Sequence, residues 1–275
     1  MSSTTKSSSV SATTKSLLLQ RGSNDSTPFS RTFFVLLRAL DLPLQYAILS
    51  SRSLAAPLIQ ALGWTAIPPT GRSVFLMGTN TGLSPQRAIL FGMAIGSFAK
   101  HSYWVTAISQ EPMSPAAAGM ISVFHSFLNT LNSIFFTSIA TSTLSYPAVD
   151  GNGTRLSIQT IVGISLYTLG MILEWGSEMQ RLRFKKDLKN KGRVYTRGLF
   201  GFARHINYGG YIIWRTGYAI TAAGWTWGAV MGGALTLDFV KNNIPELDDY
   251  CSKRYSEQWV QYKRAVPYKL FPFIL

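Results

Sequence analysis

Five consecutive residues near the end of the chain, Arg204–Tyr208, carry side chains of the kinds that bind cofactors and move protons. They stand in the sequence Gly-Leu-Phe-Gly-Phe-Ala-Arg-His-Ile-Asn-Tyr-Gly-Gly, which covers residues 198–210. Arg204 and His205 are suited to neutralise a pyrophosphate, and Asn207 is suited to hydrogen-bond a carboxamide or a ribose. Gly209 and Gly210 would let a ligand approach the backbone closely. A lone histidine at a membrane interface is usually structural, and a tyrosine there usually belongs to the aromatic belt. The contiguity of these types favours a functional site.

A basic segment precedes this stretch, and its cations are Arg181, Arg183, Lys185, Lys186, Lys189, Lys191, Arg193 and Arg197. On a helix that continues out of the membrane, Glu174, Glu178, Arg181 and Lys185 lie three or four residues apart and share one face. Such a face can bind phosphate, and arginine grips two oxygens at once. The alternative is a solvated face that also holds anionic lipid.

A polar tail follows, from 242 to 275. It contains Pro-Glu-Leu-Asp-Asp at 245–249, then Tyr255 and Trp259, and it ends with Tyr-Lys-Arg-Ala-Val-Pro-Tyr-Lys-Leu-Phe-Pro at 262–272. The acids either pair with the basic segment or bind ribose hydroxyls, as acids do in nucleotide sites. We expect the basic segment, Arg204–Tyr208 and the tail to fold together on one membrane face and to hold a large anionic cofactor.

The elements that must position these residues are apolar. Of the 275 residues 47% are hydrophobic and 14% are charged, whereas soluble domains have roughly 25% charged residues. The composition therefore indicates a polytopic membrane protein in contact with the lipid bilayer. The net charge of +14 is explained by cations clustered between apolar segments, and no motif for nucleic-acid binding accompanies them. One cysteine and three histidines exclude an internal disulfide and give no basis for a metal site.

The apolar segments predict an all-α protein with about five to seven membrane helices, since each needs about 20 residues to cross. The segments are 33–62, 87–108, 116–141, 157–175 and 208–240. The first is either one tilted span or a span plus an interfacial helix. The last is too long for one span and predicts a helical hairpin, with Gly224 near its middle and a tight contact at Gly228 and Gly232. Gly92 and Gly96 have the same spacing and predict a close approach of helix backbones.

The loops predict an orientation. Residues 1–30 are rich in Ser and Thr and read as a disordered tail, with a mitochondrial presequence as the alternative. The 142–156 loop is poor in cations and contains a glycosylation sequon at Asn152, so we expect it in the lumen and the basic segment in the cytosol. Both termini would then be cytosolic, in a membrane of the endoplasmic reticulum. The polar residues inside spans, His101, His125 and Asn129, line a substrate cavity or form hydrogen bonds between helices.

From Glu174 onward the chain resembles the C-terminal domain shared by delta-14 and delta-7 sterol reductases, steroid 5-alpha-reductase-like proteins and isoprenylcysteine carboxyl methyltransferases. The motifs are Gln-x-x-x-Phe-Lys at 180–185, Gly-Leu-Phe…Ala-Arg-His-x-Asn-Tyr-x-Gly at 198–210, and the Val-Pro-Tyr-Lys-Leu-Phe-Pro ending. The resemblance implies N-terminal membrane helices (31–173) that shape a substrate cavity and a cofactor-binding domain (174–275). It implies a cofactor shell made of Arg181, Lys185, Phe200, Arg204, His205, Asn207, Tyr208, Asp248 and Tyr255.

The asparagine of the motif and the ending look more like the reductases, so we expect an enzyme that reduces a carbon–carbon double bond of a sterol, terpenoid or other hydrophobic small molecule with NADPH. The candidate proton donor is Tyr208 or a polar residue of the N-terminal spans. Two departures stand against this: Ile206 replaces a usual proline, and the Arg-Asp-Glu run of the reductases is Glu-Leu-Asp at 246–248, which removes two expected cofactor contacts. The alternatives are an S-adenosylmethionine-dependent methyltransferase and a non-catalytic lipid-binding membrane protein.

Overall fold

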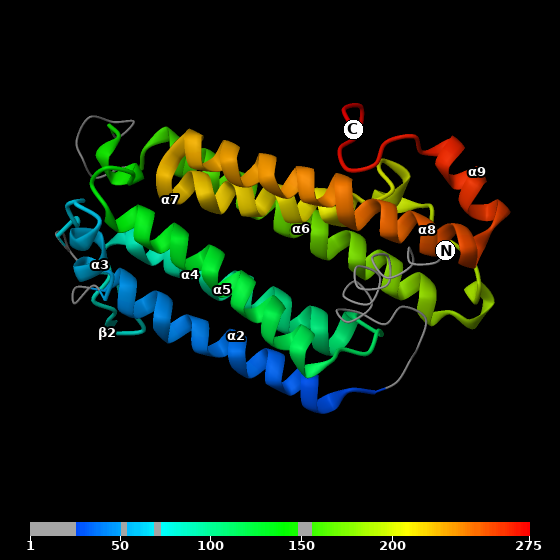
Figure 1. Ribbon diagram of the computed structural model, residues 1–275, viewed down its shortest axis with the longest axis horizontal. Helices are drawn as coiled ribbons and strands as arrows, with labels where there is room; N and C mark the ends of the chain where they lie inside the picture. The colour runs from blue at the N-terminus through cyan, green and yellow to red at the C-terminus, as the bar shows by residue number, and fades with distance from the viewer. Residues whose placement is uncertain (1–25, 51–53, 69–72, 148–155) are drawn as a thin grey trace, which may run out of the picture.

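The computed structural model describes residues 26–50, 54–68, 73–147 and 156–275. These residues are all-α apart from an isolated bridge between Ala66 and Ser138 and a short hairpin, β1 (Phe75–Leu76) paired antiparallel with β2 (Thr79–Asn80). The helices are α2 (Pro28–Leu49), α3 (Ala56–Ala61), α4 (Pro85–Tyr103), α5 (Pro115–Thr137), α6 (Ile158–Lys186), α7 (Ile206–Asp238), α8 (Ile244–Tyr255) and α9 (Glu257–Ala265). The long helices lie roughly along one direction, and α8, α9 and the C-terminus gather at one end (Figure 1).

Serine and proline set several helix starts. Pro85 and Pro115 occupy the first turns of α4 and α5, where a missing backbone N–H costs nothing. The Ser114 side chain accepts a hydrogen bond from the Ala117 amide at 3.1 Å and so caps α5. The predicted spans 87–108, 116–141 and 157–175 correspond to α4 with its π-helical extension Trp104–Ile108, to α5, and to the first part of α6.

The N-terminal apolar segment takes the second of its two predicted forms, a long helix α2 followed by the short α3. Helix α2 begins at Pro28, inside the region predicted as a tail, and residues 1–25 lie outside the described residues. The sequon at Asn152 also lies outside them.

Helix α7 is the predicted hairpin. Its helical backbone is broken at Ala223 and at Gly224, which has a φ of 74° that favours glycine. The two arms then run side by side (Figure 1). A Cβ atom on Gly232 would lie 2.7 Å from the Thr216 hydroxyl, and one on Gly228 would overlap the Ile220 side chain. The predicted tight contact at these glycines is therefore confirmed, and it joins the arms of one hairpin.

The closest backbone contact between helices lies elsewhere than predicted. A Cβ atom on Gly217 would lie 2.6 Å from the Gly163 carbonyl, and one on Gly210 would lie 2.6 Å from the Glu174 amide. Glycines spaced by seven residues on each helix thus let α6 and the first arm of α7 pack antiparallel with backbones in contact. The prediction for Gly92 and Gly96 was wrong in this respect: Gly92 has open space beside it, and Gly96 accommodates the Tyr167 hydroxyl.

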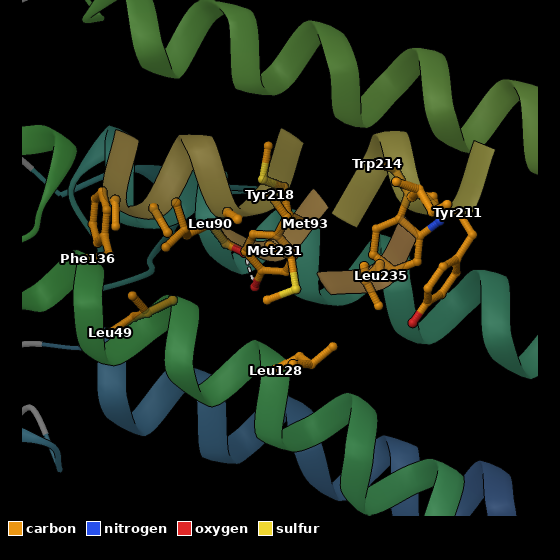
Figure 2. Packing of buried hydrophobic residues seen from close by; sticks show 14 of the residues in the cluster. Leu49, Leu90, Met93, Leu128, Phe136, Tyr211, Trp214, Tyr218, Met231 and Leu235 are labelled. Atoms are coloured by element: carbon orange, nitrogen blue, oxygen red, sulfur yellow. Dashed lines mark hydrogen bonds between the residues drawn. The ribbon is translucent and has the colours of Figure 1, made fainter. Parts of the chain in front are cut away.

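The main hydrophobic core lies between α7 and the helices α4 and α5, as Figure 2 shows. Trp214 and Tyr218 of the first arm are fully buried there, and Met231 and Leu235 of the second arm join them. The Tyr218 hydroxyl donates to the Leu90 carbonyl at 3.2 Å, which satisfies the only polar atom of that side chain. The hairpin is therefore anchored to the bundle by its aromatic face.

Two helices, α2 and α6, are long and apolar enough to cross a membrane. Helix α2 distributes its side chains in the opposite way to a helix on the surface of a soluble protein: Arg38 and Asp41 are 0% and 2% exposed, whereas Leu36 and Leu40 are 58% and 65% exposed. Helix α5 likewise buries Asn129 and exposes apolar side chains. Polar groups that face the bundle interior, with apolar groups outside, are typical of helices surrounded by lipid.

Candidate functional site

The polar tail is bound directly to the Arg204–Tyr208 stretch. The amides of Arg204 and His205 donate to the carbonyls of Tyr268 and Lys269 at 3.0 and 2.8 Å. The Arg204 guanidinium donates to the carbonyls of Val266 and Pro267 at 2.5 and 3.0 Å. The expected meeting of these two segments is confirmed, and Arg204 uses part of its donor capacity to hold the tail.

The glycines that follow have a different role from the predicted one. A Cβ atom on Gly209 would lie 2.5 Å from the Leu270 carbonyl of the tail, and Gly210 lies against α6. The prediction that a ligand contacts the backbone at these glycines was wrong, because the protein itself fills the space.

The basic segment joins the same assembly. The Gln180 side chain accepts a hydrogen bond from the Leu199 amide at 2.9 Å. Gly198, with a φ of 59°, lies so close to Gln180 that a Cβ atom would overlap it. The Tyr262 hydroxyl of α9 donates to the Phe200 carbonyl at 2.7 Å. The glutamine, the glycine and the tail tyrosine therefore fix the loop between α6 and α7.

These contacts enclose a cavity of about 390 Å³, within the size range of small-molecule sites. Glu174, Glu178, Arg181 and Lys185 all line it, so the predicted shared face of α6 is confirmed. Glu174 and Lys185 are eleven positions apart, so the cavity extends about 16 Å along α6. Of the nine side chains predicted to contact a cofactor, eight line this cavity: Arg181, Lys185, Phe200, Arg204, His205, Asn207, Tyr208 and Tyr255.

The ninth, Asp248, does not line the cavity. Its carboxylate accepts hydrogen bonds from Trp259 Nε1 at 2.8 Å and from Lys263 at 3.2 Å. Partial burial raises its pKa, but these hydrogen bonds outweigh the burial and hold the pKa below its usual value. Asp248 therefore joins α8 to α9, and Leu247 takes a place in the cavity wall.

The outer part of the cavity is built around aromatic and basic groups. The Arg181 guanidinium lies 5.3 Å from the centre of the Phe200 ring. The His205 ring stacks on Tyr208 with a centroid separation of 5.6 Å. Burial, together with the neighbouring Arg204 cation, lowers the pKa of His205 to about 3, so its imidazole is neutral at neutral pH. Within the described residues, His205 Nε2 is buried and has no hydrogen-bond partner.

The inner part of the cavity contains buried ionic groups, of which the sequence predicted only some. Lys100 forms ion pairs with Glu174 and, at 3.5 Å, with Glu178. Trp214 Nε1 donates to the other oxygen of Glu174 at 2.6 Å. Glu178 is 3% exposed, and its Oε2 atom makes the ion pair without a hydrogen bond. The inner end thus holds a carboxylate that is incompletely satisfied.

Two histidines lie beside this ionic group. His101 and His125 stack with ring centroids 4.0 Å apart, and both line the cavity. Arg215 Nη2 lies 2.5 Å from His125 Nδ1. Because a guanidinium has only donors, that Nδ1 must be the acceptor, and His125 is neutral. His101 Nδ1 is buried without a hydrogen-bond partner among the described residues.

A buried polar network continues from the histidines into the bundle. Arg215 donates to Asn129 at 2.9 Å, Asn129 donates to Asp41 at 2.7 Å, and Asp41 pairs with Arg38 at 3.0 Å. The two alternatives for polar residues within spans therefore both occur: His101 and His125 line the cavity, and Asn129 joins helices. Lys100 and Arg215 were missed, although an ionisable residue inside an apolar segment is itself a signal of function.

Comparison with known proteins identifies a family and two relatives. Residues 113–266 match the model of a family described as "Protein of unknown function (DUF1295)". The chain is 35% identical over 238 residues to the "Probable O-methyltransferase ustE" of Ustilaginoidea virens, covering 86% of this chain and 83% of that protein. It is 26% identical over 137 residues to the "Delta(14)-sterol reductase erg24" of Schizosaccharomyces pombe, covering 42% of this chain and 31% of that protein. The resemblance to sterol reductases is thus distant and partial, and the chain belongs to the DUF1295 family.

Proposed function

We propose that this protein is a membrane methyltransferase that transfers a methyl group from S-adenosylmethionine to a hydroxyl group of a hydrophobic substrate. The proposal replaces NADPH-dependent reduction as our preferred function. The similarity to a protein named as a probable O-methyltransferase covers most of both chains, whereas the similarity to a sterol reductase covers less than half of either.

The observation that carries the proposal is the buried carboxylate of Glu178. It lines the inner end of the cavity, is 3% exposed, and has one oxygen without a hydrogen bond. A buried carboxylate attracts a cation and repels an anion. S-adenosylmethionine carries a positively charged sulfur and an ammonium group, whereas NADPH carries three phosphates. Glu174 and Glu178 together face one lysine, Lys100, so these three lining side chains carry one negative charge in excess, which favours the methyl donor.

The cavity wall near the tail supports the same choice. Leu247 lines the cavity at the position where the resemblance to the reductases implies an aspartate, and Asp248 is engaged by Trp259 and Lys263. Leu247 can neither donate nor accept a hydrogen bond, so this position lacks the contact to a dinucleotide that an aspartate would make.

The remaining residues can hold the cofactor along α6. Arg181 and Lys185 at the outer end suit a carboxylate, and the rings of Phe200, Tyr208 and Tyr255 offer flat surfaces for an adenine. His205 Nε2, buried without a partner, can hydrogen-bond the base or the ribose. When bound, S-adenosylmethionine supplies an electrophilic methyl group, and the protein must hold the accepting oxygen in line with it and exclude water.

The proposal includes a membrane location. The apolar outer faces of α2 and α5 would face lipid, so a hydrophobic substrate could enter the inner cavity from the bilayer. The basic segment and the tail would lie on the cytosolic side of a reticulum membrane.

Thermal unfolding of the purified protein in detergent tests the cofactor. A ligand present at 100 times its Kd stabilises the native state by about 2.7 kcal/mol, which raises Tm by about 5–10 °C for a chain of this size. We expect this shift with S-adenosylmethionine and none with NADPH. A shift with NADPH alone would reject methyl transfer and restore the reductase function; no shift with either would favour a non-catalytic protein.

The Glu178→Gln variant tests whether the charge of this carboxylate favours S-adenosylmethionine. It keeps the shape of the side chain and removes its charge, so the affinity for S-adenosylmethionine should fall about tenfold or more. The matched control is Glu246→Gln, at an exposed position of α8, which should leave the affinity unchanged. Equal affinities in both variants would contradict the assignment.

A further inference from the structure

The imidazole of His101 is the one feature of the inner cavity that neither the fold nor cofactor binding accounts for. It is 5% exposed, it lines the cavity, and its Nδ1 atom has no hydrogen-bond partner within the described part of the chain. Buried polar atoms are nearly always paired in native proteins, because an unpaired one destabilises the fold. An unpaired nitrogen at a cavity wall indicates that its partner is a ligand.

The surroundings determine what His101 can offer that ligand. His125, stacked on it, is held neutral by Arg215. The neighbouring Lys100 and the Arg215 guanidinium on His125 are cations, and Lys100 is paired with Glu174 and Glu178. A second positive charge here would be repelled, so His101 rests as a neutral imidazole. A neutral imidazole can accept a hydrogen bond at one nitrogen.

Besides the charged group of Lys100, Glu174 and Glu178, apolar and aromatic side chains line this cavity. They include Trp104 and Ile108 of the π-helical turn that follows His101, Ile121 of α5, and Tyr211 and Phe239. A flat, apolar molecule with one hydroxyl group suits this combination, since its body packs on the rings and its hydroxyl meets the unpaired nitrogen of His101.

We propose that His101 Nδ1 accepts the hydrogen bond of the substrate hydroxyl that becomes methylated, and that the substrate is a flat hydrophobic alcohol of the phenol type. This inference rests on the proposed function and adds the substrate class and the residue that orients it. As the oxygen lone pair forms the new O–CH₃ bond, the S–CH₃ bond breaks and its electron pair stays on sulfur. The O–H proton passes to His101 Nδ1. A weak base is sufficient, because an alkylated hydroxyl is far more acidic than an imidazolium.

Binding of a matched pair of probes, without cofactor, tests the assignment. Isothermal titration calorimetry of the full chain in detergent would compare 2-naphthol with naphthalene, which lacks the hydroxyl. We expect the wild type to prefer 2-naphthol, and His101→Phe to reduce that preference about fivefold or more by weakening 2-naphthol alone. His101→Gln retains an acceptor and should recover part of the preference.

The control is Asp249→Asn, at an exposed position of α8 that does not line the cavity. It should leave the preference for 2-naphthol unchanged. A wild type that does not distinguish the probes, or a preference that survives both His101 substitutions, would overturn the inference. The result is separate from the proposed function, because stabilisation by S-adenosylmethionine with no hydroxyl preference would reject the role of His101 and leave methyl transfer standing.

Discussion

Replacing Arg204 by methionine should release the C-terminal tail from the cavity. Arg204 is 9% exposed, and its guanidinium donates to the carbonyls of Val266 and Pro267. Hydrogen bonds from charged groups contribute about 1.5–3 kcal/mol each. Because two bonds from one side chain are not additive, we take about 3 kcal/mol for the pair. Methionine fills much of the same volume but leaves both carbonyls without a donor.

Hydrogen exchange of the backbone amides measures this loss. The amides of Arg204 and His205 donate to Tyr268 and Lys269 of the tail, so they exchange only when the tail opens. A loss of about 3 kcal/mol corresponds to an exchange rate about 100-fold faster, since each 1.4 kcal/mol is a factor of ten. Affinity for S-adenosylmethionine should fall as well, because α9 contributes Trp259 to the cavity wall.

Arg197→Met is the matched control, because this arginine is exposed and lies in the same basic segment. It should leave the exchange rates unchanged. If Arg204→Met also leaves the protected amides within threefold of the wild type, the guanidinium does not hold the tail, and the direct phosphate-binding role predicted from the sequence would be the better account.

Three further changes test the packing and the buried charges. Gly217→Ala should destabilise the fold by about 2 kcal/mol or more, measured by thermal unfolding, because its Cβ would overlap the α6 backbone; Gly233→Ala, with open space beside it, should be tolerated. Asp41→Asn should cost about 3–5 kcal/mol by leaving a buried arginine without its counter-charge, whereas Asp249→Asn, in a pair more than 60% exposed, should cost less than about 0.5 kcal/mol. His205 has a folded pKa of about 3, below the 6.5 of the unfolded chain, so the unfolded state binds more protons between these values. Its contribution to stability is therefore present above pH 6.5 and falls by up to about 1.4 kcal/mol per unit as pH drops toward 3. His205→Asn should flatten this part of a Tm-versus-pH curve, and an unchanged curve would show that the histidine does not titrate in this way.

The local features of the fold were predictable because their causes are local. Proline and serine mark the starts of α4 and α5, and Gly224 marks the break in the hairpin. The shared face of Glu174 and Lys185 follows from helix periodicity alone. These predictions needed no knowledge of which helices touch.

The remaining features depend on partners far away in the chain. Lys100 and Glu174 are 74 positions apart, and Arg204 meets the Val266 carbonyl across 62. The glycine contact between α6 and α7 exists only once the two helices are paired, so neither sequence reveals it separately. Asp248 lies outside the cavity lining for the same reason, since Trp259 and Lys263 bind its oxygens.

Helix α6 connects the bundle to the polar end of the molecule without a break, from the glycine contact at Gly163 to the cavity wall at Lys185. Each residue advances an α-helix by about 100°, so one inserted or deleted residue would rotate every later side chain off the cavity. Working relatives should therefore differ in this stretch by replacement and almost never by length. A change in what this cavity recognises along α6 should therefore come from substitution of side chains at fixed helix positions.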